Sequence, residues 1–151
     1  MKMLLAVFIL LTAASLVAQS ADVAVVVNKK NPVTNVSSVE LKRILSGEKR
    51  FWPGGTAVKL LIRDPGTAER TAYLHLLSMS EKQYKEYWTE MVFKGQVDSD
   101  PVMVYSNGMQ KEAAVNISGA VVLMNAADVK GDVKILRVDS LEPGNRGYPV
   151  H

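Results

Sequence analysis

The sequence predicts an α/β fold: a three-layer α/β/α arrangement around a mostly parallel β-sheet. Two observations support this prediction. Apolar runs of strand length recur along the chain, and segments with helical spacing of apolar residues separate them. The runs are continuous rather than alternating, which is typical of strands buried on both faces. The four expected strands are Val23–Val27, Ala57–Ile62, Ala120–Met124 and Val133–Val138.

The first helix is predicted by a capping box, because Ser37 is followed three residues later by Glu40. The apolar side chains after this start share one helical face, which indicates that the helix covers one face of the sheet. Gly47 can end the helix, since glycine readily adopts the left-handed conformation found there. The expected apolar face is formed by Leu41, Ile44 and Leu45.

Three further helices are expected downstream. One runs from Thr67 to about Leu77, and the next begins where Ser80 and Gln83 form a second capping box. A short helix from about Gly108 to Val115 follows the break at residues 98–101. Aromatic and methionine side chains at helical spacing in the third helix indicate core packing rather than a cofactor site. These side chains are Tyr84, Tyr87, Trp88 and Met91.

The first twenty residues have the pattern of an export signal. Lys2 gives the positive start, Met3–Ala18 is almost wholly apolar, and Ala18-Gln19-Ser20 supplies small residues for cleavage. We expect cleavage after Ser20, which leaves a single domain of residues 21–151 with no stable membrane insertion. With 151 residues in all, the chain suits one domain.

Composition limits the compartment and the partners. The chain has no cysteine, so it has no disulfide, thiol nucleophile or lipid-attachment cysteine. An exported chain without disulfides is expected in a bacterial periplasm or secreted from the cell. Its net charge of +3 is spread along the sequence without a dense cluster. This distribution does not indicate nucleic-acid binding.

Candidate catalytic and metal-binding groups are sparse. His75 and His151 have neither the spacing of a zinc site nor an evident serine partner. Asp98 and Asp100 flank a serine before a proline, where acidic residues usually form solvated turns rather than a calcium loop. The sequence therefore predicts a non-enzymatic protein without a metal or cofactor.

The order of segments resembles the phosphate-type family of periplasmic solute-binding proteins, the capture components of ABC transporters. The most specific segment has a valine strand that leads through Asn-Pro to a Ser-capped helix, Ile-x-x-Gly and an aromatic-Trp turn. The resemblance implies the second of two lobes plus its crossover strands, without the first lobe. It also implies a small oxyanion ligand such as phosphate and a membrane transporter as partner. The resembling segments are residues 23–55, 62–77, 117–125 and 133–150.

The family's anion-binding motif, Arg-x-Asp-Gly-Ser-Gly-Thr, falls on residues 63–69. The resemblance implies ligand-binding roles for Arg63, Gly66 and Thr67, with Arg70 one turn into the helix. A helix N-terminus suits an anion, because its first amides are unpaired and carry about half a positive charge. The sequence departs from the motif where a ligand would touch, at Pro65, Ala68 and Glu69.

Two interpretations of this stretch remain open. In the first, the residues bind an oxyanion weakly, because Glu69 places a negative charge in the site. In the second, Thr67 is an ordinary helix cap, Arg63 pairs with a nearby acid, and Arg70 is a solvated surface residue. The second interpretation leads to another function, that of an interaction module whose exposed face docks a membrane or envelope protein.

Overall fold

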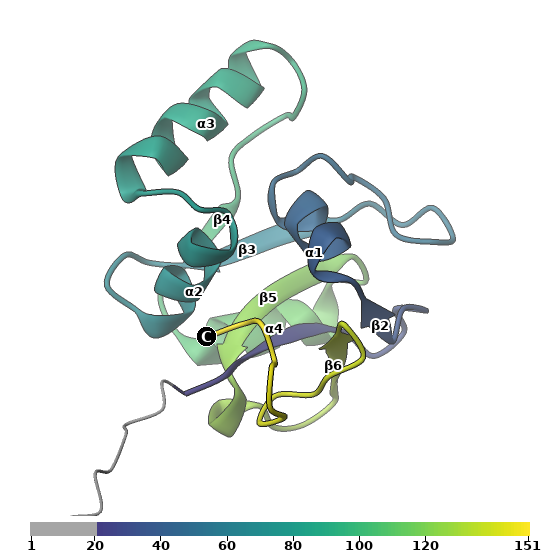
Figure 1. Ribbon diagram of the computed structural model, residues 1–151. Helices are drawn as coiled ribbons and strands as arrows, with labels where there is room; N and C mark the ends of the chain where they lie inside the picture. Colours follow the sequence, from purple (N-terminus) through teal and green to yellow (C-terminus); the bar gives the residue numbers. More distant parts are fainter. Residues whose placement is uncertain (1–20) are drawn as a thin grey trace, which may run out of the picture.

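The computed structural model describes residues 21–151, and the expected export signal of residues 1–20 lies outside that range. One six-stranded sheet is flanked by helices (Figure 1). In chain order the elements are β1 (Val23–Asn28), β2 (Asn35–Val36), α1 (Ser38–Leu45), β3 (Lys59–Arg63), α2 (Ala68–Leu76), α3 (Glu81–Phe93), β4 (Val102–Val104), α4 (Asn107–Asn116), β5 (Ala120–Asn125), the 3₁₀ helix η1 (Ala126–Asp128) and β6 (Val133–Val138).

The strands lie in the order β2-β6-β1-β5-β3-β4. β1 is antiparallel to both of its neighbours, and Val25 pairs with Leu123 of β5 and Leu136 of β6. The other three pairings are parallel, so five strands run in one direction and β1 runs against them. The predicted mostly parallel sheet is therefore confirmed. The reversed central strand was not predicted, because a continuous apolar run reports burial and not direction.

Helices cover both faces of the sheet, which confirms the predicted three layers. Figure 1 shows α1 and α2 in front of the sheet and α4 behind it. Successive residues of β1 point to opposite faces and enter two separate cores. Val25 packs in the larger core with side chains from α1, α2 and α3, whereas Val26 packs in the smaller core beneath α4.

The third helix projects beyond the sheet (Figure 1) and is attached through its aromatic side chains. Trp88 and Tyr84 are 3% and 9% exposed, and their rings meet edge-on at 6.3 Å between centroids. The predicted capping box is complete, because the side chains of Ser80 and Gln83 each bond the other residue's backbone amide. The core role predicted for the aromatic stripe is therefore confirmed.

Two short strands and one close backbone contact were not predicted from the sequence. β2 and β4 have two and three residues, too few to show a hydrophobic period. Gly119, just before β5, lies against the hairpin that precedes β3: a β-carbon there would lie 1.8 Å from the carbonyl oxygen of Ala57. The Gly119 carbonyl also accepts hydrogen bonds from the Trp52 indole and the Lys59 amide. Glycine is therefore required at this position.

No helix within residues 21–151 combines the length and apolar character needed to cross a membrane.

Candidate functional site

The candidate site lies where β3 and β4 end and the helices α2 and α4 begin. After β3 the chain turns through Asp64 to Gly66, whose φ of 89° favours glycine. Thr67 then caps α2, because its hydroxyl accepts a hydrogen bond from the Arg70 amide and donates one to the Asp64 carbonyl. Ser106 caps α4, because its hydroxyl oxygen accepts a hydrogen bond from the Met109 amide. Two helix N-termini therefore open at the same edge of the sheet.

The start of α2 presents unused hydrogen-bond donors. Within the part of the chain that the structure describes, the backbone amides of residues 66–69 donate to no other group. A β-carbon built on Gly66 would meet no atom within 4 Å, so the space beside the turn is open. These amides can donate hydrogen bonds to an anion, and the positive end of the α2 dipole favours a negative charge at the same place.

Arg63 is the last residue of β3, and three groups hold its guanidinium. Its Nη1 donates to Oδ1 of Asn107 at 2.7 Å, and its Nε donates to Oδ1 of Asp64 at 3.3 Å. The third group is the Glu69 carboxylate, whose Oε1 lies 3.8 Å from Nη1 of Arg63. The Arg63 side chain is 13% exposed, so its positive charge is matched mainly by internal carboxylates. The predicted pairing of Arg63 with a nearby acid is confirmed.

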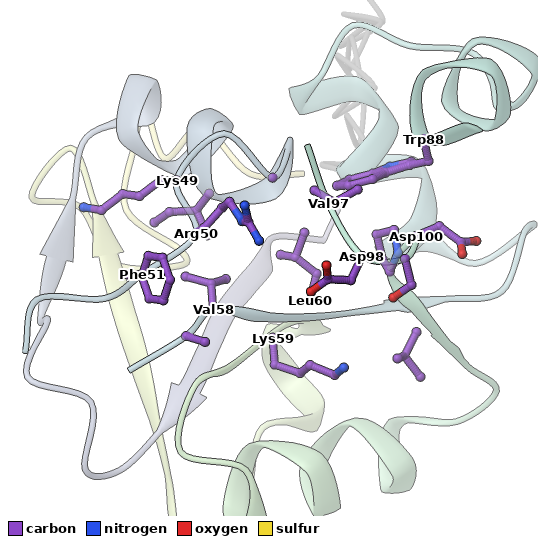
Figure 2. A pocket seen from close by; sticks show the side chains of 16 residues that line it. Lys49, Arg50, Phe51, Val58, Lys59, Leu60, Trp88, Val97, Asp98 and Asp100 are labelled. Carbon is purple, nitrogen blue, oxygen red and sulfur yellow. The ribbon is translucent and has the colours of Figure 1, made fainter. Parts of the chain in front are cut away.

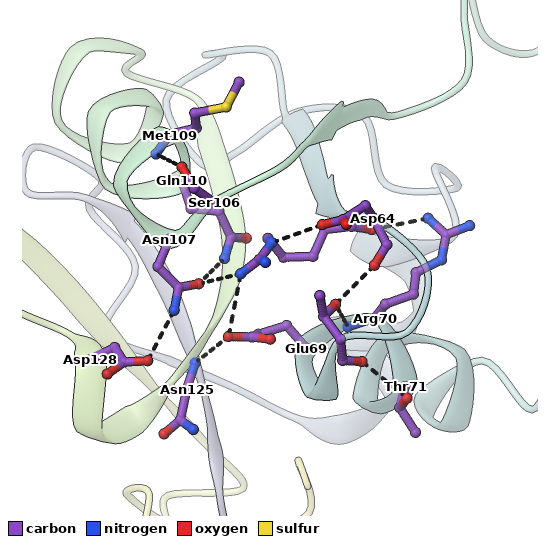
Figure 3. A network of polar contacts seen from close by, with 12 residues as sticks. Asp64, Glu69, Arg70, Thr71, Ser106, Asn107, Met109, Gln110, Asn125 and Asp128 are labelled. Atoms are coloured by element: carbon purple, nitrogen blue, oxygen red, sulfur yellow. Dashed lines mark hydrogen bonds and ion pairs between the residues drawn. The ribbon is translucent and has the colours of Figure 1, made fainter.

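Glu69 points into the protein rather than into solvent, and the residue is 6% exposed. Its Oε1 accepts a hydrogen bond from the backbone amide of Asn125 at 3.3 Å (Figure 3). The carboxylate therefore holds an amide of β5 and the guanidinium of Arg63 together, as a bound anion would. The negative charge at this position was expected from the sequence, but its hydrogen bond to β5 was not.

Two amide side chains at the start of α4 belong to the site, although the sequence did not indicate them. Asn107 accepts hydrogen bonds from Arg63 and from Nε2 of Gln110 and donates to a carboxylate oxygen of Asp128 at 2.9 Å. Gln110 is fully buried, and its Oε1 has no partner among the described residues. Asparagine and glutamine after a serine cap indicate only a helix start, so the sequence carried no signal for these roles.

Arg70 is not the solvated residue that one interpretation expected. It is 4% exposed and bonds both carboxylate oxygens of Glu81, through Nε at 3.0 Å and Nη2 at 2.8 Å. Its Nη1 donates to the Arg63 carbonyl, and its guanidinium stacks on the ring of Tyr84 at 4.1 Å. Burial raises the pKa of Tyr84 to about 12, although the adjacent Arg70 acts in the opposite direction. Helical periodicity could not reveal Arg70's partner, because Glu81 belongs to the next helix.

Arg63, Gly66 and Thr67 lie in one turn between β3 and α2, and the Arg70 guanidinium bonds the Arg63 carbonyl at its start. The two histidines lie elsewhere, with 6.2 Å between the ring centroids of His75 and His151. Within residues 21–151, no group of three or more histidine, cysteine, aspartate or glutamate side chains is arranged to hold a metal ion.

No protein-family model and no curated protein matches the sequence. Several solved structures share its fold. A Clostridium perfringens protein, described as a phosphate ABC transporter substrate-binding protein and solved with bound phosphate, superposes with a TM-score of 0.69 at 19% identity. An ABC-type phosphate transport receptor of Vibrio cholerae superposes with a TM-score of 0.65 at 23% identity, and PstS of Borrelia burgdorferi superposes with a TM-score of 0.66 at 17% identity.

These matches cover 86%, 82% and 86% of this chain but only 52%, 48% and 54% of the three solved chains. The chain therefore has the fold of about half of a phosphate-type solute-binding protein. This finding confirms the fold expected from the sequence resemblance. The identities are low, so the ligand and the transport role of the solved proteins do not transfer with the fold.

Proposed function

We propose that this chain is an exported, non-enzymatic solute-binding module that binds a small oxyanion such as phosphate weakly and non-covalently, in association with ABC transport. The observation that carries the proposal is the position of Arg63 at the same turn as the unused amides of residues 66–69. A cation and several convergent N–H donors suit a tetrahedral oxyanion. The fold shared with phosphate-binding proteins supports the same ligand class.

In this proposal the predicted ligand-binding residues have different roles. Arg63 and the amides that follow Gly66 contact the anion, and the Thr67 hydroxyl stabilises the helix start. Arg70 holds the turn in place, since its guanidinium is occupied by Glu81 and by the Arg63 carbonyl. This assignment replaces the direct ligand contact that the resemblance implied for Arg70.

Binding is weak because the site already contains negative charge. Asp64 and Glu69 lie 3.3 and 3.8 Å from the Arg63 guanidinium. An incoming anion must compete with both carboxylates for the same cation. Two unit charges about 5 Å apart repel by about 0.8 kcal/mol in bulk water and by about 3 kcal/mol at an effective dielectric constant of about 20.

A thermal-shift titration of residues 21–151 with phosphate and sulfate tests this proposal. A ligand at about a hundredfold excess over its dissociation constant stabilises the folded state by about 2.7 kcal/mol. We expect a dose-dependent rise in Tm that Arg63→Gln abolishes. The matched control is Arg137→Gln, which removes an exposed arginine on β6, on the other side of β1 from the site. The oxyanion proposal fails if the wild-type Tm does not move at millimolar phosphate or sulfate.

A second function, docking of a membrane or envelope protein, is favoured by apolar side chains beside the site. Tyr105 is 65% exposed, and Met103 and Met109 are 42% and 46% exposed. Met103 belongs to β4, Tyr105 follows that strand, and Met109 lies in the first turn of α4, so the three are close to one another in the chain. Exposed apolar side chains gathered in this way often mark protein interfaces.

Replacing Tyr105 with a photo-crosslinking amino acid tests the docking function in the exporting cell. Docking predicts one defined crosslinked product that excess phosphate does not remove. The same replacement at the exposed Arg137 of β6 should give no such product. An identical product from both positions would contradict docking at this edge.

A further inference from the structure

A cavity lies at the other end of β3, away from Arg63. It has a volume of about 270 Å³ (Figure 2). Lys59, the first residue of β3, lines this cavity, whereas Arg63 is the last residue of the strand. A strand rises about 3.3 Å per residue, so the two positions are about 13 Å apart. Binding at one can therefore be measured separately from binding at the other.

The cavity arises from a gap beside β3. Upstream, Phe51 pairs with Ala57, and the Val58 amide donates to the Arg50 carbonyl at 2.9 Å. Downstream, β4 pairs with β3 only from Leu61 onward. Between these pairings, no other strand of residues 21–151 pairs with β3 on that side, and the gap opens toward the segment that leads into β4. The gap is thus part of the strand arrangement and does not depend on one side-chain rotamer.

An apolar wall lines the interior of this cavity, which we call the β3 cleft. Trp88 and Ile44 are 3% and 0% exposed, and both contribute to the wall. The wall is closely packed, because a β-carbon on Gly47 would lie 2.8 Å from the indole of Trp88. Phe51 is 57% exposed and lines the cleft from the hairpin side. Together these side chains offer an apolar and aromatic contact surface.

Charges of opposite sign line the two sides of the β3 cleft. Arg50 and Lys59 supply cations on the β3 side, and Asp98 and Asp100 supply carboxylates from the segment before β4. None of the four forms an ion pair within residues 21–151. Figure 2 shows the guanidinium of Arg50 and the carboxylate of Asp98 directed toward the space between them.

We propose that the β3 cleft binds a small zwitterion with an apolar body, of the amino-acid class. The carboxylate of such a ligand would meet Arg50 and Lys59, its ammonium group would meet Asp98, and its side chain would lie against Trp88 and the apolar wall. The volume of the cleft is close to the lower end of small-molecule sites, about 300 Å³. The proposal is independent of oxyanion binding at Arg63.

The test is a titration of ¹⁵N-labelled protein, residues 21–151, with L-phenylalanine, followed in ¹H–¹⁵N spectra. We expect saturable shifts at the Trp88 indole and at the amides of Arg50, Lys59 and Asp98. Two analogues, 3-phenylpropionate and 2-phenylethylamine, each lack one of the two charges. Each should bind about threefold to fivefold more weakly, the contribution of one partly exposed ion pair. Phosphate should leave these signals unchanged.

Arg50→Gln and Asp98→Asn each remove one charge from the rim, and each should weaken L-phenylalanine binding by about threefold to fivefold. The control Arg137→Gln should not change it. The proposal is overturned if L-phenylalanine gives no shifts at these positions at millimolar concentrations. Equal affinity for the zwitterion and both analogues would likewise overturn it, since the cleft would then recognise only the apolar body.

Discussion

Replacing Glu69 with glutamine tests the proposal that this carboxylate weakens anion binding at Arg63. Glu69 is 6% exposed, lies 3.8 Å from the Arg63 guanidinium and accepts a hydrogen bond from the Asn125 amide. Glutamine has the same shape and keeps an oxygen for the Asn125 amide, but it carries no charge. The substitution therefore removes the competing anion while keeping the local contact.

The size of the effect follows from the geometry. An anion on Arg63 would lie about 5 Å from the Glu69 carboxylate, where like charges repel by about 0.8 to 3 kcal/mol, depending on the effective dielectric constant. Relief of this repulsion should tighten phosphate binding by about fourfold to 200-fold. We expect the lower part of this range, because solvent reaches the open side of the turn and screens the charges.

Isothermal titration calorimetry of the wild type and Glu69→Gln with phosphate measures this difference directly. Glu69→Asp is the matched control, since it keeps the charge and should leave the affinity within about twofold of the wild type. Thermal melts of each variant without ligand show whether the fold is retained. Unchanged or weaker phosphate binding by a folded Glu69→Gln variant would refute the role assigned to Glu69.

Three further predictions concern stability. Glu81→Gln removes the charge that Arg70 meets at 2.8 Å and should lower the free energy of unfolding in urea by about 1–2 kcal/mol. Gly119→Ala should cost about 3 kcal/mol or more in the same assay, because its methyl group would overlap the carbonyl of Ala57. Asp139 accepts hydrogen bonds from the hydroxyl and amide at the start of α1, and these bonds lower its pKa. Asp139→Asn should therefore be less stable than the wild type at neutral pH, and the difference should shrink as the pH falls from about 4, the ordinary pKa of the carboxyl group, through its lowered pKa in the folded state.

The controls for these three predictions are specific. Gly108→Ala should be neutral or stabilising, since its β-carbon would meet no atom closer than 3.6 Å. Lys82→Gln removes a charge whose partner Glu86 is 3.8 Å away on an exposed helix face, so its effect should stay below about 0.5 kcal/mol. If Glu81→Gln lowers the free energy of unfolding by no more than Lys82→Gln does, the contribution assigned to the Arg70–Glu81 pair is wrong. A Gly119→Ala variant as stable as the wild type would contradict the close contact with Ala57. A stability difference at position 139 that persists in acid would contradict the carboxylate's role.

Local signals in the sequence predicted the helices well. Ser80 and Gln83 act through groups only three residues apart, so their capping box could be predicted from the chain alone. The same holds for Thr67 at the start of α2. The continuous run of Val23–Val27 predicted complete burial, and every residue of β1 is buried.

Long-range pairings could not be predicted in this way. The hydrogen-bond partner of Glu69 lies in β5, 56 positions away, and that of Arg63 is Asn107 in α4, 44 positions away. Neither partner shares a period or motif with the turn that it supports. The burial of Arg70 likewise depends on α3 packing over it. The sequence therefore predicted that Arg63 pairs with a nearby acid, but not that groups of α3, α4 and β5 hold the charges around this turn. The binding role of the turn stays a prediction.

The central claim is that the turn between β3 and α2 binds an oxyanion. Its most direct test is a phosphate titration of ¹⁵N-labelled protein, residues 21–151, followed in ¹H–¹⁵N spectra that include the arginine Nε–H signals. The account predicts saturable shifts at the amides of residues 66–69 and at the Arg63 Nε–H, larger at equal phosphate concentration in Glu69→Gln. Shifts confined to other residues, or none at millimolar phosphate in either protein, would contradict it.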